Sequence, residues 1–381
     1  MGVRWLDESE LADWDSRAVD SPGGHVLQSR AWAAHREGTG WRPAFLEVGE
    51  HRALALIRPW SPVLGGGSAY LPRGPVGRTT PWTGDGTGGA LGEAVTAIAA
   101  ALGESGIDVV AADPEVAAGD TGYAAHLRAA GFRAIPEIQP SRHRMALELP
   151  ASGDPSGDAE TVLGAIAKAT RQRIRRAERD GVVVVRHDLR APDGVGDGFV
   201  APTELGGLAL NRFYGLLQAT GERRGFGFAG PDEFVAWWVR ALEAGHLVYL
   251  EAREGAADGE VLGGLVLYRH GRRLSTAHSG DRAERRRDHP GAMHLLRWRA
   301  IELALREGRT EMDLGGVDVA GARREPVAGE PTFGLFEHKQ SFGATWVELA
   351  GAHERVIRPW RYTAGRAVAR AGRVLERKLG R

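Results

Sequence analysis

The chain has 381 residues, of which 43% are hydrophobic and 26% are charged, a length and composition typical of a soluble protein with two globular domains. Cysteine is absent, which excludes disulfides, thiolate catalysis and cysteine-ligated metal sites. The 49 basic and 49 acidic residues give zero net charge, so an RNA partner would have to be held by local basic patches.

Apolar runs along the chain are short. The longest, such as 94–102, cannot cross a bilayer, and residues 1–10 lack the basic patch and apolar core of a signal peptide. We therefore expect a cytoplasmic protein without a transmembrane helix.

The first third of the chain alternates apolar runs with glycine and proline. It predicts strands at 53–57 and 70–76, a helix at 89–102, a buried strand at 107–112 that ends at Asp113-Pro114-Glu115, and a helix that ends near Gly131. Residues 150–160 are mostly small and polar, and we place a domain boundary there.

The second half of the chain shows a similar alternation of predicted strands and helices. It predicts a basic helix at 159–180, a strand at 182–186, helices at 205–220 and 232–244, a hairpin of 247–252 with 261–269, a helix at 291–307 and a strand at 311–314. The two similar halves lack the regular alternation of a doubly wound nucleotide fold, which favours two α+β modules. In 361–381, apolar residues and arginines fall on opposite helical faces, which predicts an amphipathic basic helix.

Two basic helices are candidate binding surfaces. Lys168, Arg171 and Arg175 lie at helical spacing and would form a phosphate-binding stripe, with a solvated helix face as the alternative. The stripe in 361–381 would contact RNA phosphates or anionic lipid headgroups, or would only pack against its domain.

Lysine occurs only at 168, 339 and 378, although the chain has 49 basic residues. Lys339 lies in the aromatic-rich stretch 333–342, where the sequence favours a compact ammonium over the guanidinium used elsewhere. Such a group would stabilise the oxyanion that forms when an amine attacks an ester carbonyl. A surface lysine beside core aromatic residues is the alternative.

Other familiar sites are not supported by residue spacing. Glu222 occupies the first position of the loop that binds the pyrophosphate of acetyl-CoA in N-acetyltransferases, a position that needs Arg or Gln. His278, His289 and His294 lack the spacing and nearby carboxylate of a usual zinc site. No GxSxG nucleophile elbow occurs. We expect neither a metal nor a cofactor.

Several longer motifs are more specific. Gln28-Ser29 is followed by Trp32 and Arg36, and residues 70–76 read Tyr-Leu-Pro-Arg-Gly-Pro-Val ahead of Asp113-Pro114-Glu115. Residues 312–317 read Met-Asp-Leu-Gly-Gly-Val, and 336–343 read Phe-Glu-His-Lys-Gln-Ser-Phe-Gly. Taken in order, these motifs resemble the FemABX family, the aminoacyl-tRNA-dependent transferases that build the interpeptide bridges of peptidoglycan. The resemblance covers nearly the whole chain.

Other segments extend the resemblance. Gln139-Pro140, the basic helix, and Thr220 with Arg223, Gly225 and Phe226 are similar to family segments. Three positions depart from the family pattern. Arg36 stands where lysine is more usual, Ala229 where arginine is frequent, and His338 where phenylalanine is common.

The resemblance implies an α+β protein of two tandem GNAT-like domains, residues 1–150 joined by 348–381, and residues 151–347, which face a shared groove. It implies an aminoacyltransferase that adds Gly, Ala or Ser from aminoacyl-tRNA to the third-residue amine of UDP-MurNAc-pentapeptide or lipid II, with no DNA partner. No helical arm is inserted in the second domain, which favours addition of the first bridge residue; we favour glycine. Peripheral contact with the inner face of the membrane is a further expectation.

The resemblance also assigns roles to particular residues. Lys339, with His338 beside it, would polarise the ester carbonyl, and Asp113 would take the proton of the amine. Arg36, Thr220 and Arg223 would hold the precursor phosphates, and Lys168, Arg171 and Arg175 would contact tRNA. Neither ATP nor a metal is needed, because the ester is already activated.

Three alternatives remain open. A tRNA-dependent peptide ligase that tailors a small peptide natural product would keep the chemistry and change the acceptor. An acetyl-CoA-dependent N-acyltransferase would act without tRNA. A non-catalytic protein that holds cell-wall precursors or RNA would bind without turnover.

Overall fold

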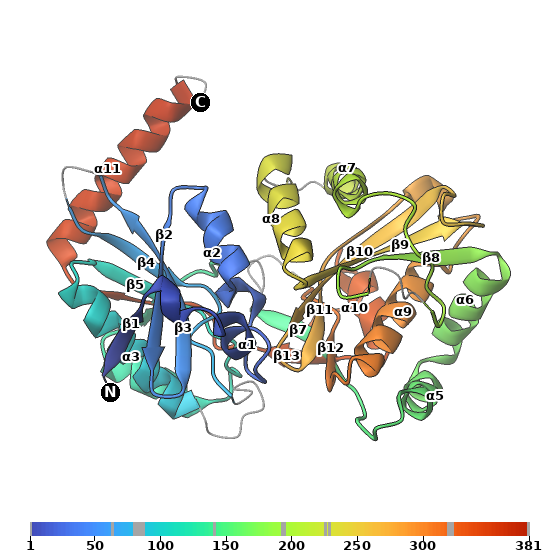
Figure 1. Ribbon diagram of the computed structural model, residues 1–381, viewed down its shortest axis with the longest axis horizontal. Helices are drawn as coiled ribbons and strands as arrows, with labels where there is room; N and C mark the ends of the chain where they lie inside the picture. Colours follow the sequence, from blue (N-terminus) through green and yellow to red (C-terminus); the bar gives the residue numbers. More distant parts are fainter. Residues whose placement is uncertain are drawn as a thin grey trace. The chain divides into compact units, whose positions relative to one another are not determined.

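The computed structural model describes residues 2–61, 65–78, 88–139, 142–191, 196–224, 227, 230–317 and 324–378, without the side chains of Arg224 and of residues 370–378. The chain divides into two compact units. Unit 1 is Met1–Arg142 with Glu348–Arg381, and unit 2 is His143–Val347. Figure 1 labels most of the elements of both.

Unit 1 contains a mixed sheet and five α-helices among its described residues. In chain order its elements are β1 (Val3–Leu6), α1 (Trp14–Ala18), α2 (Arg30–Glu37), β2 (Arg42–Val48), β3 (His51–Pro59), β4 (Gly67–Leu71), α3 (Gly88–Glu104), β5 (Val109–Ala112), α4 (Thr121–Ala129), β6 (Arg133–Ala134), β14 (His353–Val356) and α11 (Pro359–Lys378), with 3₁₀ turns at Glu8–Glu10 and Val26–Gln28. The strand order is β1-β2-β3-β4-β5-β14-β6.

Strand β3 explains how unit 1 builds hydrophobic layers on both faces of its sheet. Successive side chains of a strand point to opposite faces. Ala53, Ala55 and Ile57 pack with α3 and α4, whereas Leu54 and Leu56 pack with α1 and α2. A strand covered on both faces needs a continuous apolar run, which is why the sequence of β3 shows no alternation.

Unit 2 is larger in helical content. In chain order its elements are β7 (His143–Glu148), α5 (Pro155–Ala165), α6 (Lys168–Arg179), β8 (Val182–His187), α7 (Gly206–Arg224), α8 (Pro231–Glu243), β9 (Leu247–Glu254), β10 (Val261–His270), β11 (Arg273–Asp281), a 3₁₀ turn (Ala283–Arg285), α9 (Ala292–Arg306), β12 (Glu311–Asp313), α10 (Phe333–Gln340) and β13 (Thr345–Glu348). The strand order is β13-β7-β12-β11-β10-β9-β8.

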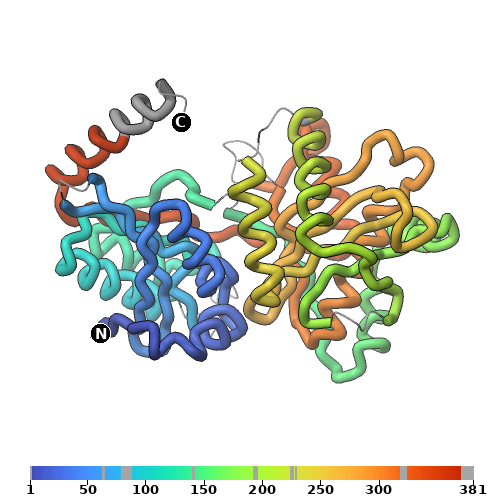
Figure 2. Tube along the Cα trace, turned by 45° about the horizontal axis from the view of Figure 1, so that its top comes forward, coloured from blue at the N-terminus to red at the C-terminus, as the bar shows by residue number. Residues whose placement is uncertain are grey.

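The sheet of unit 2 is also covered on both faces, by α7 and α8 on one side and by α9 with α5 and α6 on the other (Figures 1 and 2). On β9, Val248 and Leu250 join the core cluster that contains α9. On the opposite face of the same strand lies Tyr249, whose ring centre is 5.1 Å from that of Phe213 on α7.

The two sheets follow one plan. Each has four strands joined antiparallel, then a helical crossover to a parallel neighbour: β4 with β5 across α3, and β11 with β12 across α9. The strand beyond the parallel pair is antiparallel in both sheets, and it is β14 in unit 1 but β7 in unit 2. The strand position next to β5 in unit 1 is therefore filled by a segment that follows the whole of unit 2 in the chain.

Two sequence-based boundaries differ from the structure. The units divide after Arg142 rather than at 150/151, because β7 belongs to the second sheet and residues 155–165 form α5. The basic helix predicted at 159–180 is two helices, since Ile166 takes an extended conformation with φ −63° and ψ 143°.

Candidate functional site

In unit 1, the ends of the parallel strands β4 and β5 carry a buried polar cluster around Asp113. The Tyr70 hydroxyl donates to the Asp113 carboxylate at 2.9 Å, and the backbone N–H of Arg73 donates to it at 2.8 Å. The Arg73 guanidinium lies 3.9 Å from the same carboxylate, and Gln139 donates to the Tyr70 hydroxyl at 2.9 Å. The Tyr-Leu-Pro-Arg-Gly-Pro motif thus closes over the strand-end acid.

Asp113 is 1% exposed, and its environment tunes its proton affinity. Burial raises the pKa of Asp113 to about 6, although the charge of Arg73 and the hydrogen bonds from Arg73 and Tyr70 oppose that rise. A carboxylate with a pKa near neutrality is suited to proton transfer. Arg73 has φ +51°, a left-handed conformation that is costly for a residue with a side chain.

The Gln28-Ser29 motif has a structural role. Gln28 is fully buried, donates to the Pro72 carbonyl and accepts from the Leu54 N–H, both at 2.6 Å. Ser29 caps α2 by accepting from the Trp32 N–H. Near the end of that helix, the Arg36 guanidinium lies 5.4 Å from the Trp32 ring centre.

In unit 2, Lys339 is buried rather than at the surface, with 4% of its area exposed. Its Nζ donates to the carbonyl oxygens of Gly315 at 2.8 Å and Gly316 at 2.6 Å. Gly315 has φ +79°, and a β-carbon there would lie 3.0 Å from the Thr276 carbonyl. The Asp-Leu-Gly-Gly motif at the end of β12 therefore presents carbonyls to the α10 lysine.

His338 precedes Lys339 on α10 and is half-buried. Its Nε2 accepts a 2.9 Å hydrogen bond from Arg297 Nε on α9. Burial, followed by the charges of Arg297, His294 and Lys339, lowers the pKa of His338 to about 2. The ring is neutral at pH 7 and is a poor candidate for proton transfer.

The basic helix α6 brings its three predicted cations to one side but uses them differently. Lys168 and Arg175 are exposed. Arg171 instead donates through Nη1 to the Gly164 carbonyl at 2.7 Å and to the Leu163 carbonyl at 3.4 Å. Its guanidinium therefore caps the end of α5, and its contact with RNA stays a prediction.

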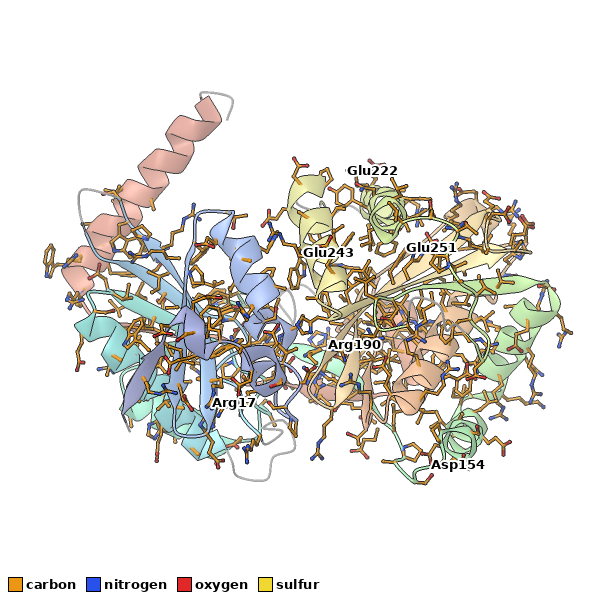
Figure 3. All side chains as sticks on the ribbon, in the orientation of Figure 1. Arg17, Asp154, Arg190, Glu222, Glu243 and Glu251 are labelled. Atoms are coloured by element: carbon orange, nitrogen blue, oxygen red, sulfur yellow. The ribbon has the colours of Figure 1, made fainter. Side chains whose placement is uncertain are left out.

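Thr220 and Arg223 meet near the end of α7. Arg223 Nη2 donates to Thr220 Oγ1 at 3.1 Å and lies 3.8 Å from an Asp281 carboxylate oxygen on β11. Figure 3 labels Glu222, which lies beside them on the same helix. Pro140, Gly225, Phe226 and Ala229 of the sequence motifs lie outside the described residues.

The histidines considered as metal ligands have separate partners. His278 lies between the rings of Phe234 and Trp238, at 5.3 and 5.4 Å, and burial lowers its pKa to about 4. His289 Nε2 lies 3.1 Å from a Glu254 carboxylate oxygen. His294 instead contacts Arg173, with Nη1 3.3 Å from its Nε2.

A buried ionic cluster surrounds Glu251, which Figure 3 labels in unit 2, and no motif in the sequence predicts it. The ligand atoms of His187, Glu204 and Glu251 lie within 4.8 Å of one another. Guanidiniums of Arg212 and Arg253 occupy the carboxylates, so the cluster is a network of ion pairs. Burial alone would raise the pKa of Glu251, but hydrogen bonds from His187 and the two arginines outweigh it and lower the pKa to about 2.

The start of α9 packs closely against α6. A β-carbon at Gly291 would lie 2.2 Å from the Arg173 carbonyl oxygen. In acetyl-CoA-dependent N-acetyltransferases, free backbone N–H groups at the start of a helix bind the pyrophosphate. A carbonyl oxygen packed at this point disfavours that anion.

Membrane-spanning helices are not found within the described residues, where each helix is either too short or too polar for a bilayer. The amphipathic helix α11 exposes 72% of Trp360 and 38% of Val368.

Comparisons with known proteins agree with this architecture. Residues 166–327 match the family model described as "Acetyltransferase (GNAT) domain", and no curated protein matches the chain. The crystal structure of FemX is similar with 18% identity and a TM-score of 0.72, over 96% of this chain and 99% of that one. A conserved protein of unknown function from Bacteroides thetaiotaomicron is similar with 12% identity and a TM-score of 0.53, over 93% and 99% of the two chains.

The GNAT domain match, the repeated sheet plan and the FemX likeness confirm the predicted α+β fold of two GNAT-like domains. The chain therefore has a fold like that of FemX, and its residues 166–327 match a GNAT domain.

Proposed function

We propose that the protein is an aminoacyl-tRNA-dependent transferase that joins Gly, Ala or Ser to the third-residue side-chain amine of a peptidoglycan precursor, UDP-MurNAc-pentapeptide or lipid II. The observation that carries the proposal is the buried ammonium of Lys339, fixed by the carbonyls of Gly315 and Gly316. The chain has lysine at only three positions and arginine at its other basic positions, so a lysine at 339 indicates a requirement for a compact ammonium there.

The proposed reaction is aminolysis. The amine nitrogen attacks the ester carbonyl carbon, a C–N bond forms, and the carbonyl oxygen becomes an oxyanion. The C–O bond to the tRNA ribose then breaks, and the ribose hydroxyl leaves with a proton. Lys339 would stabilise the oxyanion, and alignment of two bound substrates would supply much of the remaining rate.

Asp113 is the proposed acceptor for the amine proton. Its pKa near 6 keeps most of it ionised at pH 7 while leaving it basic enough to accept a proton. We assign no proton transfer to His338, because its pKa is about 2.

The proposed substrate contacts are arginines and hydroxyls that present donors to phosphate. Arg36 in unit 1, and Thr220 with Arg223 in unit 2, are proposed for the precursor diphosphate. The exposed Lys168 and Arg175 are proposed for tRNA phosphates. A peripheral membrane contact of α11, through its exposed Trp360, is part of the same proposal for a lipid-linked acceptor.

The test mixes purified protein with tRNA charged separately with radiolabelled Gly, Ala or Ser and with either precursor. We expect label to move to one precursor and to fail to move with Lys339→Ala. Turnover of acetyl-CoA without tRNA, or transfer only to other small peptides, would replace the proposal with one of the two enzymatic alternatives. Binding without any turnover would leave the non-catalytic alternative.

A further inference from the structure

Arg297 is an unusual buried arginine. It is 2% exposed, and within the described residues the only hydrogen bond of its side chain is the one from Nε to His338 Nε2. Its Nη1 is buried without a partner, and burial lowers the pKa of its guanidinium to about 10, so it is still charged at pH 7. A buried charge without a counter-ion is costly, and proteins keep such groups mainly where function requires them.

Other buried arginines of unit 2 have carboxylate counter-ions, unlike Arg297. Arg269 is paired with Asp188 and Glu307, and Arg253 is paired with Glu251. Among the described residues, no carboxylate forms an ion pair with Arg297.

The two histidines near Arg297 each use Nε2 as an acceptor, which leaves Nδ1 of each ring as a donor. His338 Nε2 accepts from Arg297, and His294 Nε2 lies 3.3 Å from Arg173 Nη1, which can only donate. In a neutral imidazole one nitrogen accepts and the other carries the proton. The proton of each ring is therefore on Nδ1, and His294 Nδ1 is buried without a partner.

The two imidazoles and Arg297 form one cluster. The His294 and His338 rings are 4.6 Å apart, and Phe342 packs beside both, at 6.2 and 5.4 Å. Arg173, which contacts His294, is exposed, so the cluster extends from a surface cation to a buried one. It presents several N–H donors and, in the described residues, no acidic partner.

We propose that Arg297, His294 and His338 form a binding site for one phosphate-type oxyanion. A tetrahedral oxyanion offers enough acceptor oxygens for a guanidinium and two imidazole N–H groups, and it would neutralise the buried charge. His338 immediately precedes Lys339, so the site would hold a phosphate beside the proposed catalytic lysine.

The experiment titrates the intact protein with inorganic phosphate at constant ionic strength and follows the imidazole ¹H–¹⁵N signals, which His294→Gln and His338→Phe assign. A parallel arm uses the dinucleotide CpA, which carries one phosphodiester. We expect saturable shifts of both imidazoles in at least one arm. A response to CpA identifies an RNA phosphate as the source, and a response to inorganic phosphate alone identifies a free phosphate.

Arg297→Met is expected to weaken phosphate binding at least tenfold without lowering the melting temperature, because it removes an uncompensated buried charge. Arg299→Met is the control, since Arg299 lies on the same helix but is paired with Glu178 and Glu302. The proposal is wrong if neither ligand shifts the imidazoles, or if Arg297→Met binds as tightly as wild type. Neither readout uses aminoacyl transfer, so this site and the proposed function stand or fail separately.

Discussion

The ammonium of Lys339 donates a 2.8 Å hydrogen bond to the carbonyl oxygen of Gly315, at the turn that follows β12. Gly315 is in a left-handed conformation, which is costly for a residue with a side chain, and a β-carbon there would lie a tight 3.0 Å from the Thr276 carbonyl oxygen. The strand-end glycine thus fixes the position of the buried charge.

Replacing Lys339 with methionine should keep the volume of the side chain and remove the charge. If Lys339 stabilises the oxyanion, aminoacyl transfer should fall by about 100-fold to 1000-fold. Radiolabel transfer from charged tRNA measures this loss, and circular dichroism checks the fold. Gln340→Ala, an exposed change on the same helix, is the matched control; an equal loss in that variant would contradict the assignment.

Substitutions of two α6 arginines should affect stability and RNA binding separately. Arg171→Ala removes donors to the carbonyls at the end of α5 and should lower the free energy of unfolding by about 1 to 2 kcal/mol. Arg175→Ala should change it by less than about 0.5 kcal/mol. If Arg175 binds RNA phosphate, its loss should lower tRNA affinity and reduce the salt dependence by about one ion. Urea unfolding and filter binding measure the two effects.

The pH dependence of transfer should report Asp113. A base with a pKa of about 6 is ionised above that value, so the rate should fall as the pH drops below about 6. Tyr70→Phe removes a hydrogen bond that favours the carboxylate and should move this limb to higher pH. A limb that stays in place in the Tyr70→Phe variant would argue against Asp113 as the titrating group.

Glu251 should make unit 2 sensitive to acid. Its pKa is about 2 in the folded protein, below the ordinary value of 4.5, so its stabilising contribution is present above about pH 4.5 and is lost as the pH falls toward 2. Glu251→Gln removes the buried carboxylate that pairs with Arg253 and with the partly exposed Arg212, both of which keep Glu204 as a partner, and should cost about 1 to 3 kcal/mol at pH 7. Denaturant unfolding at pH 7 and pH 4 measures both effects.

Apolar periodicity predicted the elements that are built from apolar residues. The run 53–57 lies within β3, and 89–102 lies within α3, because each buries side chains against a hydrophobic cluster. Strand β14 reads His-Glu-Arg-Val and was missed, since it is held by backbone pairing and by an ion pair between Glu354 and Arg133. Polar strands of this kind carry no periodic signal.

The residues of the candidate site also differ in whether the sequence alone can identify them. Lys339 was identifiable because lysine is rare in this chain, whereas Arg297 was not, since arginine is its common basic residue. Only the packing around Arg297 distinguishes it, and that packing depends on contacts between α9 and α10. Likewise, helical spacing placed Arg171 on the basic face but gave no information on the α5 carbonyls that it caps.

The placement of β14 has a consequence for the order in which the protein is completed during synthesis. In the unit 1 sheet β14 lies between β5 and β6, and β6 pairs with β14. A ribosome reaches residue 353 only after all of unit 2 has been made, so the domain that is started first is the last whose sheet can close. Until then, β5 and β6 are open edges exposed to wrong partners. A chain that is released early, just before β14, would carry a full set of unit 2 strands and an unfinished N-terminal sheet.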